Sequence, residues 1–189
     1  MNCTTQEKSH TEEIQQHQYE LNTFYADVEE SPLTEEDLKI FKSLDFFPIN
    51  ENYKVEASFE LTPNELVFEM LTTTDRLANY RKYGIATFSI DEKEIKLSLY
   101  RNQKYLDHPE YGKLLFLPFK DLTNGNTSYG GGRFIDIDIP EKNSSSIIID
   151  FNKAYNPYCA YNKKYSCPIP PYENHLEVAI EAGVAFTKQ

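Results

Sequence analysis

The sequence predicts a mainly β (α+β) fold, a small antiparallel β-barrel or sandwich with one or two N-terminal helices. Apolar residues recur at helical spacing before residue 45 and alternate with a period of two from residue 54 onward. All of the 14% aromatic content is Tyr and Phe, which favour half-buried strand surfaces. The 189 residues can bury one hydrophobic core, so we expect a single domain over 12–189 after a flexible leader over 1–11. Within this domain, residues 12–45 should be helical and residues 52–189 rich in β-structure.

Two amphipathic helices are predicted at the start of the domain. Ile14 and other apolar residues fall on one face of a helix expected over Glu12–Glu29, which the following Ser-Pro pair stops. Thr34 is the expected N-cap of a second helix, because three acidic residues follow it in the first turn. This helix should end before Pro48. Its expected apolar face comprises Leu38, Phe41 and Leu44.

Short strands with turn residues between them are predicted for the rest of the chain. They are expected at Lys54–Leu61, Leu66–Phe68, Tyr83–Ile90, Glu94–Arg101, Leu114–Phe119, Arg133–Ile139, Ser146–Phe151 and Leu176–Ile180. Residues Ser89–Glu94 would join two of them as a hairpin, although this connection lacks an Asn-Gly turn signal. Many short strands of this kind are typical of antiparallel barrels and sandwiches.

The charge and the N-terminus bear on partners and location. A net charge of -11 argues against nucleic acid as a partner, because it repels the phosphate backbone. No apolar run reaches the roughly 18 residues that a membrane-spanning helix needs, so membrane contact would require a lipid anchor. Cys3 precedes a polar stretch similar to the start of a mature bacterial lipoprotein, and lipidation there would place the domain at the cell envelope. The alternative is an incidental terminal cysteine in a cytoplasmic protein.

A glycine-rich segment lies between two predicted strands. Residues 124–133 combine an Asn-Gly turn signal with three consecutive glycines and Arg133. The glycines allow a bend or bulge into the next strand, because they adopt backbone conformations that other residues avoid. Alternatively, their N–H groups form a concavity for an anionic group, with Arg133 supplying the positive charge.

Arg133 shares a strand face with the isoleucines that follow it, which places its guanidinium at the rim of the apolar side. A partly buried arginine needs a carboxylate partner, and Asp150 and Glu173 are the candidates. The pair would be either a structural ion pair that clamps the long loop or part of an anion or substrate site.

Cys159 and Cys167 have 7 residues between them, a spacing that closes a small loop. They could form a disulfide in an oxidising compartment or remain as buried thiols. Zinc binding together with His175 is a weaker interpretation, because a closed zinc site needs four ligands. A cysteine nucleophile activated by His175, with Asn174 or Asn156 as its orienting group, is another. The other histidines lie among polar residues and are expected to be exposed: His10, His17 and His108.

Four segments together resemble one family of bacterial and archaeal proteins. They are DFFPI with YKVEA (45–57), FKDLTNG with YGGGRF (119–134), DFNKAYNP with CAY (150–161), and CPIPP with EN and L (167–176). From about residue 33 to its end, the chain is similar to domain of unknown function 1684. The resemblance implies no activity. It implies that a secretion signal or lipoprotein leader is common among relatives, which supports the interpretation of Cys3. It also implies that many members have a longer N-terminal β portion, in whose place this chain has a helical leader.

We expect from these observations a binding module for a small ligand, which the charge of Arg133 indicates is anionic. The ligand-binding candidates are Tyr129, Arg133, Asp150, Asn152, Tyr155, Asn156, Glu173 and Asn174. The principal alternative is a hydrolase-type enzyme at the same place, with Asp150 or Glu173 as general base or a cysteine as nucleophile. A structural envelope protein without a small-molecule site is a third interpretation. The expected partner is a small molecule or an envelope protein, with no cofactor and no metal ion.

Overall fold

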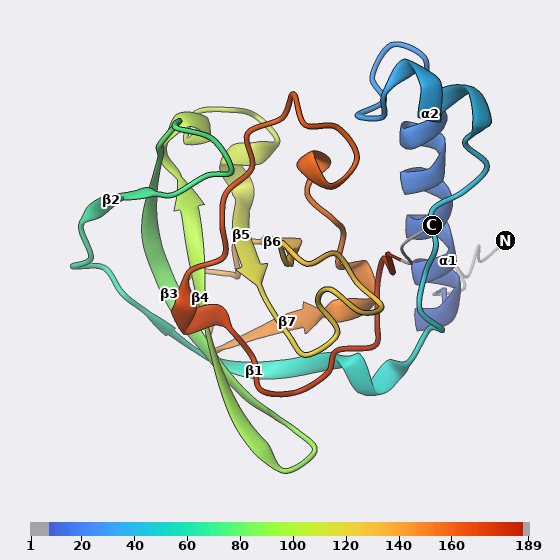
Figure 1. Cartoon of the computed structure of the whole chain (residues 1–189). Helices are drawn as coiled ribbons and strands as arrows, with labels where there is room; N and C mark the ends of the chain where they lie inside the picture. Colours follow the sequence, from blue (N-terminus) through green and yellow to red (C-terminus); the bar gives the residue numbers. More distant parts are fainter. Residues whose placement is uncertain (1–7, 187–189) are drawn as a thin grey trace, which may run out of the picture.

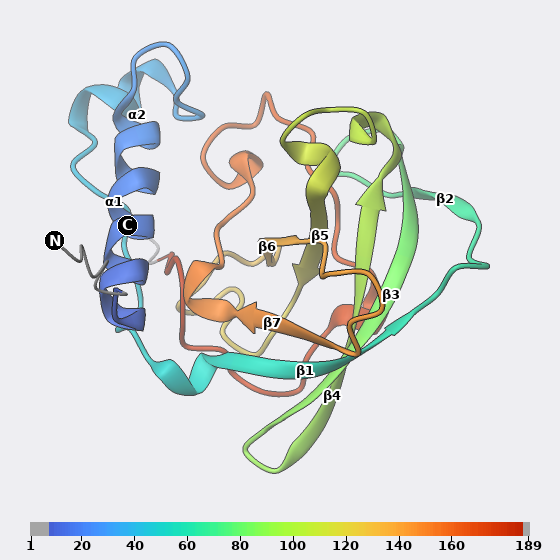
Figure 2. The same ribbon diagram turned by 180° about the vertical axis from the view of Figure 1, so that it is seen from behind.

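The structure, a computed structural model, describes residues 8–186 and is an antiparallel β half-barrel with an N-terminal helix beside it (Figures 1 and 2). In both views, α1 stands on the side of the sheet opposite β2. The expected mainly β fold with N-terminal helices is confirmed. Its main elements are α1 (His10–Ala26), α2 (Glu35–Ile40), β1 (Lys54–Leu61), β2 (Val67–Met70), β3 (Ala78–Ile90), β4 (Lys93–Asn102), β5 (Leu114–Phe119), β6 (Arg133–Asp138) and β7 (Ser146–Asp150).

A capping box starts α1. The Ser9 hydroxyl accepts from the Glu12 N–H, and the Glu12 carboxylate accepts from the Ser9 N–H at 2.8 Å. The helix ends before Asp27, because this residue is extended and its carboxylate accepts the N–H groups of Glu29 and Glu30. The local hydrogen bonds of Asp27 therefore end α1 earlier than the apolar spacing predicts.

Thr34 caps α2 as predicted, with its hydroxyl accepting from the Asp37 N–H at 3.1 Å. The helix is shorter than predicted and ends just before Phe41, whose ψ of 134° is not helical. Phe41 and Leu44 nevertheless pack with Tyr25 of α1, in a small apolar cluster that also includes part of the C-terminal segment. The predicted apolar face is therefore real, although only part of it is helical.

One sheet contains all seven strands, in the order β6-β5-β4-β3-β1-β7, with β2 paired to β3. β2 pairs with the first residues of β3 and β1 with later ones, and a bulge lies between them at Lys82 and Gly84. The β3–β4 hairpin turns through Asp91 and Glu92, which have φ values of 49° and 62°. Positive φ at both positions suits the twist of a two-residue hairpin, so the predicted connection forms without Asn-Gly.

The chain after β7 returns to the other edge of the sheet, where Tyr155 forms a β-bridge with Phe134. The strand predicted at Leu176–Ile180 is wrong, because this segment has no assigned strand. It makes two isolated backbone bonds with the residues after β5, from the Leu176 N–H to the Lys120 carbonyl and from the Leu122 N–H to the Val178 carbonyl. Its side chains alternate between buried and exposed, which explains the prediction. One backbone N–H that a strand partner would bind, that of Ile180, is instead accepted by the Asp121 carboxylate at 3.2 Å.

The main hydrophobic core lies between the sheet and this C-terminal segment. Its buried members come from six strands, β1 and β3 to β7, and from residues 151–154 and 176–182. Burial of each large apolar side chain stabilises the fold by roughly 1.5–3 kcal/mol relative to exposure. Within residues 8–186, no helix has both the length and the apolar character needed to cross a membrane.

Candidate functional site

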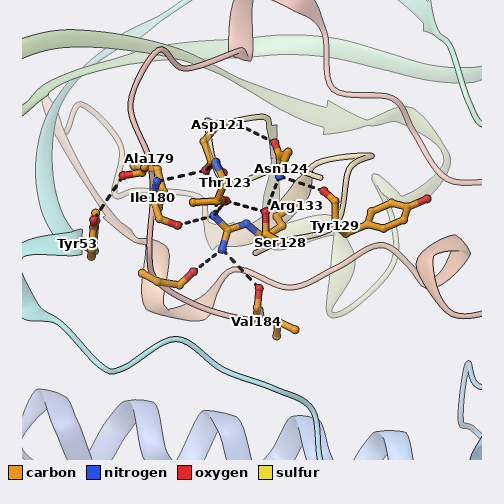
Figure 3. Close-up of polar contacts among 11 residues, drawn as sticks. Tyr53, Asp121, Thr123, Asn124, Ser128, Tyr129, Arg133, Ala179, Ile180 and Val184 are labelled. Carbon is orange, nitrogen blue, oxygen red and sulfur yellow. Dashed lines mark hydrogen bonds and ion pairs between the residues drawn. The ribbon is translucent and has the colours of Figure 1, made fainter. Parts of the chain in front are cut away.

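Arg133 lies fully buried at the start of β6, enclosed between the β5–β6 loop and the C-terminal segment (Figure 3). Its Nη2 atom donates to Asp121 Oδ2 at 2.8 Å and to the carbonyl of Ile180 at 2.6 Å. Its Nη1 atom donates to the carbonyl of Ala182. The guanidinium carbon lies 5.3 Å from the centroid of the Phe119 ring. Arg133 thus joins the loop, the core and the end of the chain.

The ion pair of Arg133 is with Asp121, so the predicted pairing with Asp150 or Glu173 is wrong. Burial lowers the pKa of Arg133, whereas the Asp121 carboxylate favours its charged form. Both side chains of the pair have 0% exposure, and the protein itself supplies the carboxylate and carbonyl partners. This geometry is that of the structural clamp rather than that of an open anion site.

Strand register is the signal that identifies Asp121. Arg133 opens β6 directly opposite Phe119, the last residue of β5, so residues just after Phe119 lie at the same end of the hairpin. Asp121 Oδ1 also accepts from the Thr123 N–H at 2.8 Å and the Thr123 hydroxyl at 2.6 Å. These bonds fix the carboxylate in the position where it meets the guanidinium.

The three glycines form the bend into β6. Gly132 has φ of 97°, and its N–H donates to the carbonyl of Tyr129 at 3.1 Å. A Cβ atom on Gly131 would lie 2.3 Å from the ring of Tyr129, so this glycine makes room for the ring. Figure 3 shows the Tyr129 side chain directed away from the guanidinium of Arg133. The turn interpretation of the glycines fits this geometry, because the Gly132 N–H already has a partner within the chain.

Asp150 and Asn152 attach the end of β7 to the N-terminal part of the domain. Asp150 Oδ2 lies 2.7 Å from His10 Nε2 of α1, and Asp150 Oδ1 accepts from the Asn152 side chain at 2.8 Å. Asn152 also bonds both backbone groups of Asn50, at 3.0 and 2.9 Å. The expected exposure of His10 and His17 is wrong: the side chain of His10 is 10% exposed, and burial lowers the pKa of His17.

Asn174 links β4 to β5 through its side chain. It accepts from the Ser98 N–H at 2.8 Å and donates to the carbonyls of Ser98 at 2.8 Å and Pro118 at 2.7 Å. The backbone ladder between β4 and β5 has a single pair in register, Tyr100 with Phe116. The fully buried Asn174 amide therefore bonds backbone groups of both strands beside that pair.

Tyr155 and Asn156 lie next to this closed region. The Tyr155 hydroxyl donates to Asp136 Oδ2 at 2.6 Å. The Asn156 amide, which is fully buried, donates to the Tyr161 hydroxyl at 2.9 Å and the Ala185 carbonyl at 3.4 Å. The motifs at 119–134, 150–161 and 167–176 therefore meet around the C-terminal segment. Most of their polar side chains form hydrogen bonds within the protein.

Glu173 differs from these residues because it lies at an open groove of about 710 Å³. Its Oε1 atom accepts from the Tyr100 hydroxyl at 2.6 Å and from Lys82 Nζ at 2.8 Å. Partial burial opposes ionisation of Glu173, but the bonds from Lys82 and Tyr100 outweigh it and lower its pKa. The groove is lined by Glu60, Leu61, Thr62, Pro63, Asn64, Glu65, Leu66, Phe68, Lys82, Tyr100, Pro171 and Glu173.

Local structure brings these groove residues together. The β1–β2 connection is held to β3 because Thr62 donates its N–H to the Tyr83 carbonyl at 3.0 Å and its hydroxyl to the Lys82 carbonyl at 3.1 Å. This contact lies at the bulge of β3, next to Lys82, whose Nζ atom lies 2.8 Å from Glu173 Oε1. The apolar wall is unusually exposed for large side chains, with Leu66 at 82%. Glu173 was predicted from the sequence as a site residue, but the other groove residues have no local sequence signal.

Cys159 and Cys167 are free thiols in contact with each other. The Cys159 N–H donates to Cys167 Sγ at 3.2 Å. The predicted metal and nucleophile roles of His175 are not supported by its position, because its Nε2 atom lies 3.2 Å from the carbonyl of Pro170. Within residues 8–186, no group of three or more His, Cys, Asp or Glu side chains is placed to hold a metal ion. The predicted lipidation site Cys3 lies outside the described residues.

The fold and these sites define a small β half-barrel in which polar motifs hold the C-terminal segment, with a separate groove at one end of β1. The chain belongs to the DUF1684 family of proteins of unknown function, whose model matches residues 39–185. It is also similar to the uncharacterized protein from gene locus rrnAC0354 of Haloarcula marismortui, known from a solution NMR structure. The two share 31% sequence identity with a TM-score of 0.71, over 93% of this chain and 94% of that one. No curated protein matches the chain.

Proposed function

We propose that this protein is a binding module for a small molecule and that the ligand occupies the groove beside Glu173. The supporting observation is the combination of large exposed apolar side chains with a hydrogen-bonded cluster of Tyr100, Glu173 and Lys82 in one concave site. Ligand sites typically combine apolar walls with a few polar groups that fix orientation. Leu66 and Phe68 supply the wall, with 82% and 37% exposure.

The charge of the groove favours a ligand with a cationic or hydrogen-bond-donating group. Three glutamates, Glu60, Glu65 and Glu173, face one lysine, Lys82, which already pairs with Glu173. The expectation of an anionic ligand depended on Arg133, whose guanidinium is enclosed and paired with Asp121. We therefore propose an amine or amide donor attached to an apolar body as the ligand class.

A matched pair of probes tests this proposal. Phenethylamine and 3-phenylpropionate share an apolar ring and differ in charge, so titration of the ¹⁵N-labelled full chain with each compares the two ligand classes directly. Amide shifts at residues 60–68 and 171–173, with tighter binding of the amine, are expected. Tighter binding of the carboxylate, or shifts that cluster away from these residues, would contradict the proposal.

Two variants separate the polar and apolar parts of the site. Glu173→Gln should weaken amine binding by about tenfold or more, because a hydrogen bond to a charged group contributes roughly 1.5–3 kcal/mol. Phe68→Ala should weaken both probes. Leu122→Ser is the matched control, because Leu122 is 61% exposed and does not line the groove.

The place of action is a separate proposal that rests on the position of Cys3 and on the leaders expected for the family. We propose that the protein acts at the cell envelope through a lipid on Cys3. Mass spectrometry of the protein from its native host checks this directly. An unmodified Cys3 in the mature chain would rule out the anchor.

A further inference from the structure

The two cysteines in the described part of the chain differ in exposure although they touch. Cys159 lies in a short 3-10 helix, Tyr158–Ala160, and is partly exposed, whereas Cys167 is only 7% exposed. The Cys159 N–H donates to Cys167 Sγ at 3.2 Å, which holds the buried thiol beside the backbone of Cys159. One thiol can therefore be reached from solvent while the other lies behind it.

Two hydroxyl groups act on Cys159. The hydroxyls of Thr73 and Tyr129 both lower the pKa of its thiol, because hydrogen bonding from them favours the thiolate. Thr73 is fixed by two backbone bonds with Cys167, which accepts from its N–H at 2.9 Å and donates to its hydroxyl at 3.1 Å. Tyr129 is positioned by the absence of a side chain at Gly131, where a Cβ would lie 2.3 Å from its ring.

This arrangement favours a thiolate on Cys159 and a thiol on Cys167. Hydrogen bonds from the Cys167 thiol, Thr73 and Tyr129 outweigh partial burial and lower the pKa of Cys159. The thiol of Cys167 donates to the Cys159 sulfur and is itself buried, so the pKa of Cys167 is raised. A reactive cysteine is typically an accessible thiolate, and an internal partner in contact with it can complete a disulfide.

We propose that Cys159 and Cys167 form a dithiol that reduces disulfide substrates, with Cys159 as the attacking thiolate and Cys167 as the resolving thiol. This activity is independent of the groove beside Glu173. It gives a role to Tyr129, which was predicted as a site residue and lies outside the groove.

The reaction balances in two exchange steps. The Cys159 thiolate attacks one sulfur of the substrate disulfide, forms a mixed disulfide and displaces the other half as a thiolate, which takes the proton of Cys167. The Cys167 thiolate then attacks Cys159 Sγ, forms the internal disulfide and displaces the second half, which is protonated by solvent. The two protein thiols are oxidised, and the substrate disulfide is reduced to two thiols.

Trapping of the mixed disulfide tests the assignment of roles. The chain has 3 cysteines, so the full chain is used in a Cys3→Ser background and treated with cystamine at neutral pH. Cys167→Ser should accumulate one cysteamine adduct, on Cys159, because the resolving thiol is absent. Cys159→Ser should lose adduct formation, and the parent should end as the internal disulfide without an adduct. An adduct on Cys167, or oxidation of the parent by hydrogen peroxide but not by cystamine, would overturn the proposal.

A second variant tests the hydrogen bond from Tyr129. In the Cys167→Ser protein, Tyr129→Phe should shift the pH profile of adduct formation to higher pH, because the Cys159 thiolate loses a donor. Tyr172→Phe is the matched control, since Tyr172 is 87% exposed. An unchanged pH profile in Tyr129→Phe, with a folded protein by circular dichroism, would show that Tyr129 has no part in thiolate stabilisation and would contradict the proposed site.

Discussion

The region around Arg133 and the groove beside Glu173 contain similar residue types but use them differently. Arg133 and Asp121 have no exposed surface, and Arg133 bonds this carboxylate and backbone carbonyls of the C-terminal segment. Lys82 and Glu173 form an equally short ion pair with 21% and 47% exposure, beside exposed apolar side chains. Burial therefore distinguishes the two regions better than residue type does: an enclosed pair stabilises the fold, whereas an open pair remains accessible to a ligand.

The largest expected effect breaks the enclosed pair. Arg133→Met should lower the free energy of unfolding by about 3–5 kcal/mol, because the Asp121 carboxylate would be left buried without its partner. Urea denaturation measures the change. Arg76→Met, at an exposed arginine, should cost about 1 kcal/mol or less and serves as the control.

A double variant identifies the partner. If Asp121 is the unpaired charge, Asp121→Asn should recover part of the stability lost in Arg133→Met, whereas Asp150→Asn and Glu173→Gln should not. Recovery by Asp150→Asn instead would contradict the pairing found in the structure.

Asn174 is a second enclosed side chain, and it tests whether a buried amide stabilises the fold as the ion pair of Arg133 does. Asn174→Ala leaves the Ser98 N–H and the carbonyls of Ser98 and Pro118 without their bonds, in a site with no exposure. Unsatisfied buried groups cost roughly 1–3 kcal/mol each, and partial relaxation should limit the loss to about 2–4 kcal/mol. Asn64→Ala in the groove is the control with little expected effect, and equal midpoints for the two variants in thermal denaturation would refute the clamp role of Asn174.

The sequence predicted the elements of this fold better than it predicted contacts between them. Alternating residues and cap signals are local, so the predicted Leu114–Phe119 strand and the Thr34 cap are confirmed. The alternation at Leu176–Ile180 predicted a strand, but only a side chain, that of Asp121, bonds the Ile180 N–H. Period alone does not show whether a neighbouring strand bonds the whole segment.

The site was harder to predict for the same reason. A polar residue in a turn has the same local pattern whether it faces solvent or the core. The neighbours Glu173 and Asn174 were therefore equally good candidates, although only Asn174 is fully buried. Prediction of the Arg133 partner required the β5–β6 register, and prediction of the groove required the contact between Lys82 of β3 and Glu173. Both are contacts between segments that the separate predictions do not place relative to each other.

Acid should weaken the contact between His17 of α1 and the segment after β7, with a smaller loss of stability than in the variants at Arg133 and Asn174. Burial and the nearby Lys153 charge lower the pKa of His17, although Glu20 and Asp150 oppose this. The folded state then binds fewer protons than the unfolded state, so the stabilisation is present above the unfolded pKa of about 6.5 and is lost as pH falls through the folded pKa. The difference between the urea midpoints at pH 8 and pH 5 should be smaller in His17→Gln than in the parent. His108→Gln, at an exposed histidine, is the control. If it reduces the difference between the midpoints equally, the effect is not specific to the His17 contact.

The smallest expected effect is at the open pair, and it completes the comparison with Arg133. Glu173→Gln removes the charge that Lys82 binds, but Gln retains an acceptor for the Tyr100 hydroxyl. Because water reaches both Lys82 and Glu173, the stability should change by about 1 kcal/mol or less, in contrast to the enclosed pair. Urea denaturation of Glu173→Gln beside Arg133→Met measures this difference. A loss as large as that of Arg133→Met would mean that Glu173 is also a structural clamp, and the groove would then lose the polar group on which ligand orientation depends.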